Sequence, residues 1–485
     1  MTAATQPAYG RVIITITLPV FLAIASQTMT AAALPAIGGA MGELARLSWL
    51  VIAYMFALTV AGPVYGNLGD MFGRRRVLVS AACIYAIGSF VAILAPTFEW
   101  LTVARLIQGI GGGGLMSISQ ALIGHTVDTR RRGKAQGYVA SVGVVASSLG
   151  PVIGGGLTAV FGWQSQFVFV LPLAVLAAVM VWRLPVTETG ASNRQFDTKG
   201  FLLLNAFVGC WVLALEYIKS TTLEGYGIGA TLILAGLIMV GMLMRVESRA
   251  ANPIFPPSLM ANSDIARSYA LALCHGATLV SFTAFLPLYM QLVWGADIFE
   301  SSAALLSLTV GLGLGGVLTG NLISRTGRVA IFPAVGSLAA FVLVIVLALF
   351  GQGLPLQVLL PMLFFNGLGM GTVMSVVHVT VQQVVPKHLR GAGAGAVTFS
   401  RSIGSVLGTA VVTVVLFAAA STQGLDTNLM QVGSPMTSET SRRWAMAFTF
   451  AILTIALFAA GGAIAAISSR VKRLDGGDGQ AEDAH

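Results

Sequence analysis

The segment GNLGDMFGRRR at residues 66–76 places one acid and three arginines within seven positions of a 485-residue chain in which only 9% of residues are charged. Asp70 can form a charge-assisted pair with Arg74 or Arg75, about one helical turn away. Its carboxylate can also accept hydrogen bonds from the N-terminus of a neighbouring helix, where an anion is stabilised by about 0.3 to 1 kcal/mol. The pattern predicts a latch that forms in one conformation only. The alternative is that the arginines serve topology alone.

A second copy of this segment, GNLISRTGR, occupies residues 320–328 and keeps the G-N-L start and the later G-R. In the first copy, Gly66 and Gly73 allow close backbone approach and a tight turn. Ser324 stands at the position that matches Asp70. We therefore expect a strong latch in the first half of the chain and a weak one in the second.

Two arginines and two histidines lie inside apolar segments, namely Arg105, Arg401, His275 and His378. An arginine in an apolar span must meet a partner, backbone carbonyls or a water-filled cavity. Histidine can gain and lose a proton near neutral pH. These residues are candidates for proton coupling or ligand binding; the alternative for each is a hydrogen-bonded packing role.

The elements that position these residues are membrane-spanning helices. The chain is 56% hydrophobic with a mean hydropathy of +0.85, and roughly 20 apolar residues suffice to cross a hydrocarbon core of about 30 Å. The sequence therefore predicts an all-α integral membrane protein with fourteen transmembrane helices. They are expected at 12–34, 47–69, 77–96, 100–124, 135–160, 164–182, 200–218, 226–244, 267–291, 302–323, 329–350, 356–384, 392–419 and 444–469.

The distribution of positive charge predicts the orientation. With both termini in the cytoplasm, most of the 27 lysines and arginines fall on cytoplasmic segments, as short loops require. We expect a multi-pass protein of the bacterial cytoplasmic (inner) membrane without a cleavable signal peptide. The net charge of +9 then reflects topology and contact with anionic lipids, and no nucleic-acid partner is expected. The three cysteines show no motif spacing and are interpreted as packing residues.

An internal repeat divides the chain into two halves. At an offset of 258 residues, QGIG at residues 108–111 recurs as NGLG at 366–369. We predict a six-helix bundle at 11–183, two inserted helices with linkers at 184–250, a second six-helix bundle at 251–470 and a disordered tail at 471–485. Parallel halves of this kind rock about a central binding site in transporters; a duplication without moving parts is the alternative.

Three motifs now support a family resemblance. GNLGDMFGRRRVL (66–78), LTVARLIQGIG (101–111) and ASSLGPVIGG (146–155) resemble, in order and spacing, signatures of the major facilitator superfamily. WLVIAY (49–54), FLPLYMQLVWG (285–295) and the two-helix insert resemble its fourteen-helix drug:proton antiporter branch. The resemblance implies a major facilitator fold and a role for Arg105 in proton coupling or substrate binding.

The third motif resembles the signature associated with antiporters. Its residues Gly150, Pro151, Gly154 and Gly155 remove side chains and a backbone donor, which suits close helix packing. We expect this face to form a seam against a helix of the other half. A kinked packing helix is the alternative.

One departure from the branch bears on the substrate. The first helix of the branch carries an acid where ASQTMTAAALP (25–35) places Ser26, and no Asp or Glu lies at the middle of any predicted helix. Because a buried cation without a carboxylate is uncompensated, we expect neutral, lipid-like or anionic substrates. The candidate cavity residues are Ser26, Gln27, Thr28, Tyr54, Arg105, Gln108, His275, Gln291, Asn366, His378 and Arg401.

The resulting hypothesis is a monomeric secondary transporter that exports amphipathic or hydrophobic small molecules in exchange for protons, with His275 as the titrating group. The alternatives are a proton-coupled importer and a non-transporting membrane scaffold or receptor. An enzyme is not expected, because the sequence has no phosphate loop, no metal-ligand cluster and no nucleophile elbow. No cofactor or metal is therefore predicted.

Overall fold

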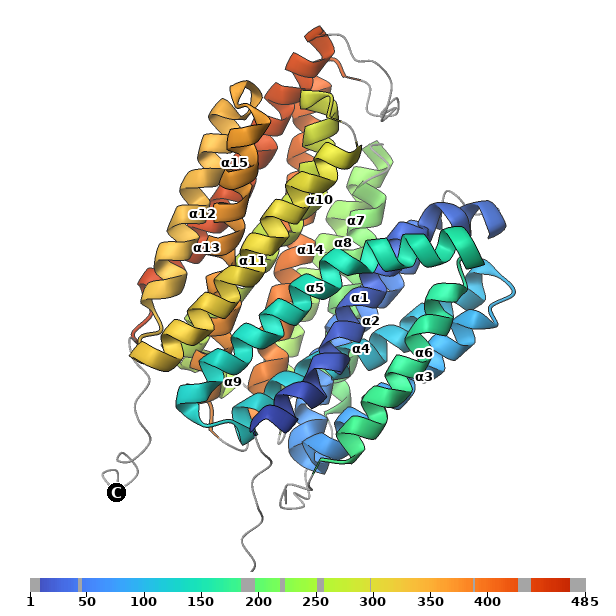
Figure 1. The fold of residues 1–485 in the computed structure, drawn as a ribbon, viewed down its shortest axis with the longest axis vertical. Helices are drawn as coiled ribbons and strands as arrows, with labels where there is room; N and C mark the ends of the chain where they lie inside the picture. The colour runs from blue at the N-terminus through green and yellow to red at the C-terminus, as the bar shows by residue number, and fades with distance from the viewer. Residues whose placement is uncertain are drawn as a thin grey trace, which may run out of the picture.

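The computed structural model describes residues 9–41, 46–184, 197–218, 223–250, 257–296, 298–386, 389–425 and 438–471. Within these ranges the chain forms fourteen helices of 18 residues or more and no extended strand (Figure 1). Thirteen of them are long and apolar enough to cross a membrane, and α7 holds a shorter apolar segment, Thr198–Ala214. The prediction of an all-α protein with fourteen long helices is confirmed.

The first six helices pack against one another and form the N-terminal bundle. Polar ends extend several of them beyond the predicted spans, because backbone hydrogen bonds continue past the apolar segment. They are α1 (Tyr9–Met41), α2 (Ser48–Phe72), α3 (Arg74–Ile93), α4 (Phe98–Thr126), α5 (Thr129–Phe161) and α6 (Ser165–Trp182).

The last six long helices form the C-terminal bundle. They are α10 (Ser263–Trp294), α11 (Ile298–Thr326), α12 (Ile331–Phe350), α13 (Leu356–Val384), α14 (Arg390–Thr422) and α15 (Ser438–Ile467). A short helix, α9 (Pro257–Ala261), precedes α10, and a 3-10 turn (Gly351–Gly353) follows α12. The Asn262 side chain caps α10 by accepting hydrogen bonds from the Asp264 and Ile265 amides.

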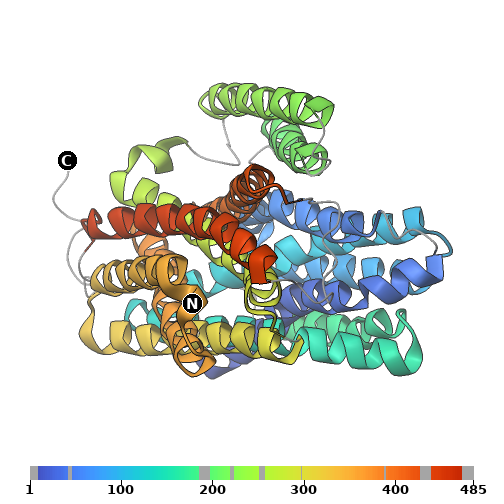
Figure 2. The same cartoon turned by 90° about the horizontal axis from the view of Figure 1, so that it is seen from above.

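The inserted helices α7 (Thr198–Ile218) and α8 (Leu223–Glu247) pack mainly on each other. They lie together on one side of the molecule, where α7 contacts α2 and α14 (Figure 2). Val60, Phe207 and Phe399 from these three helices share one apolar cluster. The predicted domain boundaries agree with this arrangement and stay predictions; residues 185–196 and 472–485 lie outside the described residues.

The two bundles meet through α2 with α14 and α5 with α11. They converge at the end of the molecule where α1 begins and α15 ends, and diverge toward the other end (Figure 1). We call the converging end the terminal face. The close contacts between these helix pairs involve residues 62–70 with 391–398 and residues 133–144 with 313–324, which are the halves of the helices nearest that face.

The sequence repeat corresponds to a repeated packing pattern. A Cβ added at Gly109 of α4 would overlap the Tyr54 carbonyl of α2, and one added at Gly367 of α13 would overlap the Leu308 carbonyl of α11. Glycine at these matched positions therefore lets α4 and α13 approach their neighbours at backbone distance. Small residues serve this purpose in membrane helices because close packing, more than hydrophobicity, holds the helices together.

We predict that Gly367→Ala destabilises the C-terminal bundle, because the added methyl group would overlap the backbone of α11 and overpacking costs about 1 to 3 kcal/mol. The unfolding temperature in detergent, followed by fluorescence size-exclusion chromatography, should fall by several degrees. Gly241→Ala on α8 is the matched control, since a Cβ there meets nothing within 4 Å. Equal unfolding temperatures for the two variants would contradict the prediction.

Candidate functional site

The Asp70 carboxylate joins the two bundles at the terminal face. Its side chain is 3% exposed and forms an ion pair with Arg74. Oδ1 accepts a hydrogen bond from the Gly391 amide at 3.1 Å, and Oδ2 accepts one from the Ala392 amide at 3.1 Å. Since α14 begins at Arg390, an acid of the N-terminal bundle caps a helix of the C-terminal bundle. The expected pairing and capping are both present.

Arg75 does not take part in the pairing, and its guanidinium lies 5.0 Å from the centre of the Trp182 ring on α6. The glycines have the expected geometric roles. Gly73 separates α2 from α3 with φ of 94°, which favours glycine. Gly66 faces Gly391 so closely that a Cβ on either would overlap the carbonyl oxygen of the other. This approach brings Asp70 within reach of α14.

The second copy of the segment makes the related contact between α11 and α5. The Ser324 hydroxyl accepts a hydrogen bond from the Lys134 amide at 3.1 Å. Gly320 and Gly133 face each other there, and a Cβ on Gly320 would overlap the Gly133 carbonyl. A neutral hydroxyl replaces the carboxylate, so this contact lacks charge assistance.

Two further hydrogen bonds close the terminal face, and sequence reasoning did not single out their donors. Gln382 Nε2 donates to the Gln120 carbonyl and Arg390 Nη1 donates to the Gly124 carbonyl, both at 2.9 Å. Arg390-Gly391 repeats Arg132-Gly133 at the offset of 258 residues, whereas Gln382 belongs to no such repeated pair. The molecule is therefore closed between the bundles at the terminal face.

Arg105 is the centre of a buried polar cluster in the N-terminal bundle. The residue is fully buried, and its guanidinium lies 4.2 Å from the centre of the Tyr54 ring. Nη1 donates to Ser26 Oγ at 3.0 Å and to Gln108 Oε1 at 2.5 Å. Nε donates to the Leu50 carbonyl at 3.3 Å. Four of the predicted residues are thus brought together.

No carboxylate contacts this arginine among the described residues. Its Nη2 has no hydrogen-bond partner there either. Gln108 Nε2 continues the cluster to Ser89 Oγ at 2.9 Å, and Tyr85 packs in the same core. Neither Ser89 nor Tyr85 was predicted, because nothing in the sequence of α3 marks them. The cluster presents a fixed positive charge with neutral partners.

His275 and His378 lie in the C-terminal bundle, away from the Arg105 cluster. Both side chains are buried, and Arg401 of α14 interacts electrostatically with each of them. The backbones of α10 and α14 touch here, because a Cβ on Gly276 would overlap the Arg401 carbonyl. Arg401 is therefore the positive neighbour of both histidines.

The remaining candidates do not converge on one cavity. Thr28 Oγ1 donates to the Ala25 and Ala146 carbonyls and packs between α1 and α5. Asn366 Nδ2 donates to the Ala340 carbonyl at 3.3 Å, so this amide faces α12. Gln27 and Gln291 are partly exposed. The expectation of a single polar cavity that includes Thr28 and Asn366 is corrected.

The glycine motif of α5 also contacts a different helix from the expected one. A Cβ on Gly150 would overlap Thr28, and one on Gly154 would lie 2.6 Å from the Met29 Cα, so both pack on α1 of the same bundle. Gly155 has open space and Pro151 is exposed. The seam with the other bundle uses the earlier part of α5, because the bundles diverge beyond it.

Comparisons with known proteins agree with this architecture. Residues 16–409 match the Major Facilitator Superfamily. An uncharacterized MFS-type transporter of Mycobacterium tuberculosis is 29% identical over 419 residues, which cover 86% of this chain and 60% of the relative. This chain thus matches less than two thirds of that relative's length. Multidrug resistance protein 3 of Bacillus subtilis is 26% identical over 420 residues, covering 84% of this chain and 80% of the relative.

Among solved structures, the human organic anion transporter of the same superfamily superimposes with a TM-score of 0.65 at 13% identity, covering 93% of this chain and all of that one. This likeness shows the fold alone. The sequence match extends over most of the chain and includes both bundles. The chain belongs to the Major Facilitator Superfamily and is a multi-pass membrane protein.

Proposed function

We propose that the chain is a secondary active exporter of amphipathic or hydrophobic small molecules that works by alternating access in exchange for protons. The observation that carries this proposal is the Asp70 cap on α14 across the bundle boundary. Such a contact must break for the terminal face to open. Homology to a bacterial multidrug resistance protein supports export of small molecules.

The distribution of positive charge supports a cytoplasmic position for the terminal face in the bacterial inner membrane. Arg74 and Arg390 both lie there. The conformation described here is then closed to the cytoplasm. The protein works as a monomer in contact with membrane lipids, since each bundle has its own core and the two bundles enclose the pathway between them.

The Arg105 cluster supports neutral, lipid-like or anionic substrates. A buried guanidinium with tyrosine, serine and glutamine partners favours an anionic or hydrogen-bonding group and repels a cation. The importer and the scaffold remain the competing functions. An importer would move the substrate in the opposite direction, and a scaffold would not move it at all.

The deciding experiment is transport in proteoliposomes with an imposed pH gradient and a panel of cationic, neutral and anionic amphiphiles. We expect movement opposite to the proton gradient that an uncoupler abolishes, with anionic or neutral compounds preferred. Movement in the same direction as the protons would identify an importer. Absence of movement for the whole panel would favour the scaffold.

We predict that Asp70→Asn lowers turnover more than substrate binding. The amide loses the ion pair with Arg74 and one charge-assisted hydrogen bond, each worth about 1.5 to 3 kcal/mol, so the cytoplasm-closed state becomes less populated. Turnover and equilibrium binding in the same preparation measure the two effects. Glu99→Gln is the control, because that acid pairs with Arg46 at the opposite face. Wild-type turnover in a folded Asp70→Asn protein would refute the latch.

Ser26→Asp should shift selectivity toward cations. The new carboxylate would lie near the Arg105 guanidinium, which is 3.0 Å from Ser26 Oγ, and would neutralise the fixed charge. Transport of cationic compounds should rise while transport of anionic compounds falls. Ser26→Asn, of equal size and no charge, should leave the preference unchanged. A Ser26→Asp protein with wild-type selectivity would place the cluster outside the substrate path.

A further inference from the structure

Two small, half-open cavities lie one after the other along α10 in the C-terminal bundle. Both are bounded by α10, α12, α13 and α15. The α10 residues that line them are Arg267, Ser268, Leu271, Cys274, His275 and Thr278, which share one face of the helix by their spacing of three and four. The lining of the outer cavity includes Arg267 near the terminal face, and that of the inner cavity includes His275. Leu271 lines both cavities.

The inner cavity is large enough for a water molecule and is lined mostly by apolar residues. About 20 Å³ of it is open to the centres of water molecules, and roughly 10 to 15 Å³ is enough for one. His275, Thr278 and Ser337 supply polar groups. Gly462 forms part of the wall, and a Cβ there would lie 3.5 Å from the Cys274 Cβ and 3.9 Å from Ser337 Oγ. The buried imidazole of His275 thus lines a space with room for a water molecule.

The charged surroundings of His275 come from one helix. Arg401 of α14 is its positive neighbour. The other three helices contribute only uncharged residues to the inner cavity. These are Met370 and Val373 from α13, Ser337 and Ala340 from α12, and Phe458, Ala459 and Gly462 from α15. His378 is on α13, two turns beyond Met370, and interacts with the same arginine. Arg401 is thus the charged neighbour of His275 among the described residues.

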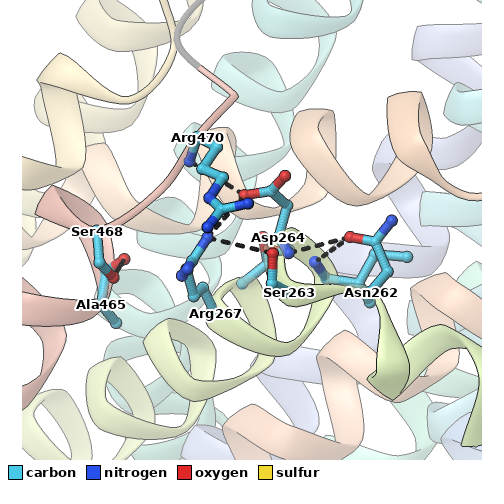
Figure 3. A network of polar contacts seen from close by, with 9 residues as sticks. Asn262, Ser263, Asp264, Arg267, Ala465, Ser468 and Arg470 are labelled. Carbon is cyan, nitrogen blue, oxygen red and sulfur yellow. Dashed lines mark hydrogen bonds and ion pairs between the residues drawn. The ribbon is translucent and has the colours of Figure 1, made fainter.

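The outer cavity leads from Leu271 to the terminal face. It has room for about one water, with about 10 Å³ open to water centres, and Ser268 and Thr380 lie in its wall. At its mouth, Asp264 pairs with Arg267 at 3.2 Å and accepts a hydrogen bond from the Arg470 amide at 3.0 Å (Figure 3). The ion pair of Asp264 and Arg267 thus stands next to the mouth of the outer cavity.

Leu271 separates the two cavities. Its side chain is 5% exposed and packs with Ala272 and Val373 in one apolar cluster. It offers no polar atom to a hydrogen-bonded chain of waters. In the conformation described here the path between the cavities is therefore dry at this residue, which prevents a proton leak while the terminal face is closed.

We propose that the coupling proton leaves His275 for the cytoplasm through these two cavities inside the C-terminal bundle, past Leu271, and not through the substrate path between the bundles. The imidazolium gives its proton to water in the inner cavity and becomes neutral. The proton passes through water in the outer cavity to the Asp264 side of the mouth. This inference rests on the proposed proton coupling, and it separates the exit of the proton from the path of the substrate.

The test uses full-length protein in proteoliposomes that contain a pH-sensitive dye, with an imposed pH gradient and no substrate. Leu271→Ala joins the cavities, so the gradient should decay several-fold faster than with wild type. Leu363→Ala is the matched control, since Leu363 is buried in the same bundle but borders neither cavity. The double variant Leu271→Ala and His275→Ala should return to the wild-type rate. Size-exclusion profiles check that each variant is folded.

A folded Leu271→Ala protein that leaks no faster than Leu363→Ala would overturn the inference, and so would a double variant that leaks as fast as Leu271→Ala. Gly462→Val gives a second readout, because it fills the inner cavity from the α15 side. It should lose proton-driven transport and keep substrate exchange; unchanged proton-driven transport counts against the route. Since the leak assay contains no substrate, failure of the exporter proposal appears separately, as wild-type transport indifferent to the pH gradient.

Discussion

The burial of one carboxylate constrains the rest of the molecule. Asp70 is removed from water between two bundles, and a buried charge is tolerated only when it is paired and hydrogen-bonded. Arg74 supplies the ion pair, and the first amides of α14 supply two hydrogen bonds. All these partners are needed together, so the closed state depends on the placement of α14. A small displacement of one bundle removes the amides and returns the acid to water.

That placement of α14 is possible because the glycines have no side chains. Gly66 and Gly391 bring α2 and α14 to backbone contact, and any side chain at either position would keep Asp70 out of reach of the amides. The same requirement recurs between α5 and α11 at Gly133 and Gly320. Two close contacts related by the repeat thus act as one hinge at the terminal face. Only the contact between α2 and α14 includes a charged side chain. Asp70 therefore contributes more to the stability of the closed state than Ser324 does.

The fold was predictable because the length of an apolar span and the distribution of charge can be read directly along the sequence. All fourteen long helices follow from runs of apolar residues, and the two-bundle arrangement follows from the repeated glycines. The partner of Asp70 was predictable in kind, as a helix N-terminus, but not in identity. Gly391 is 321 residues away, and no local pattern specifies that approach.

The candidate site shows where the sequence stops being informative. Position in a span indicates how deep a residue lies in the membrane. Which way a residue faces around its helix depends on neighbouring helices. Thr28 therefore meets α5, and Asn366 meets α12. The sequence did identify Arg105, Ser26 and Gln108, because the first and last belong to a family motif and the serine replaces an expected acid. Such features indicate which side of a helix faces the site.

The two bundles divide the charge chemistry between them. The N-terminal bundle holds Arg105 without a carboxylate and contributes the acid that closes the terminal face. The C-terminal bundle holds the buried histidines beside Arg401 and the helix terminus that receives the acid. In the proposed mechanism, substrate recognition and proton handling reside on opposite sides of the interface between the bundles. Coupling between them must pass through the relative position of the bundles, because no hydrogen bond among the described residues links Arg105 to either histidine. Under the proposed mechanism, a chain without an acid in its first helix can still couple, since the free energy of the Asp70 contact differs between the two states and so links the two bundles.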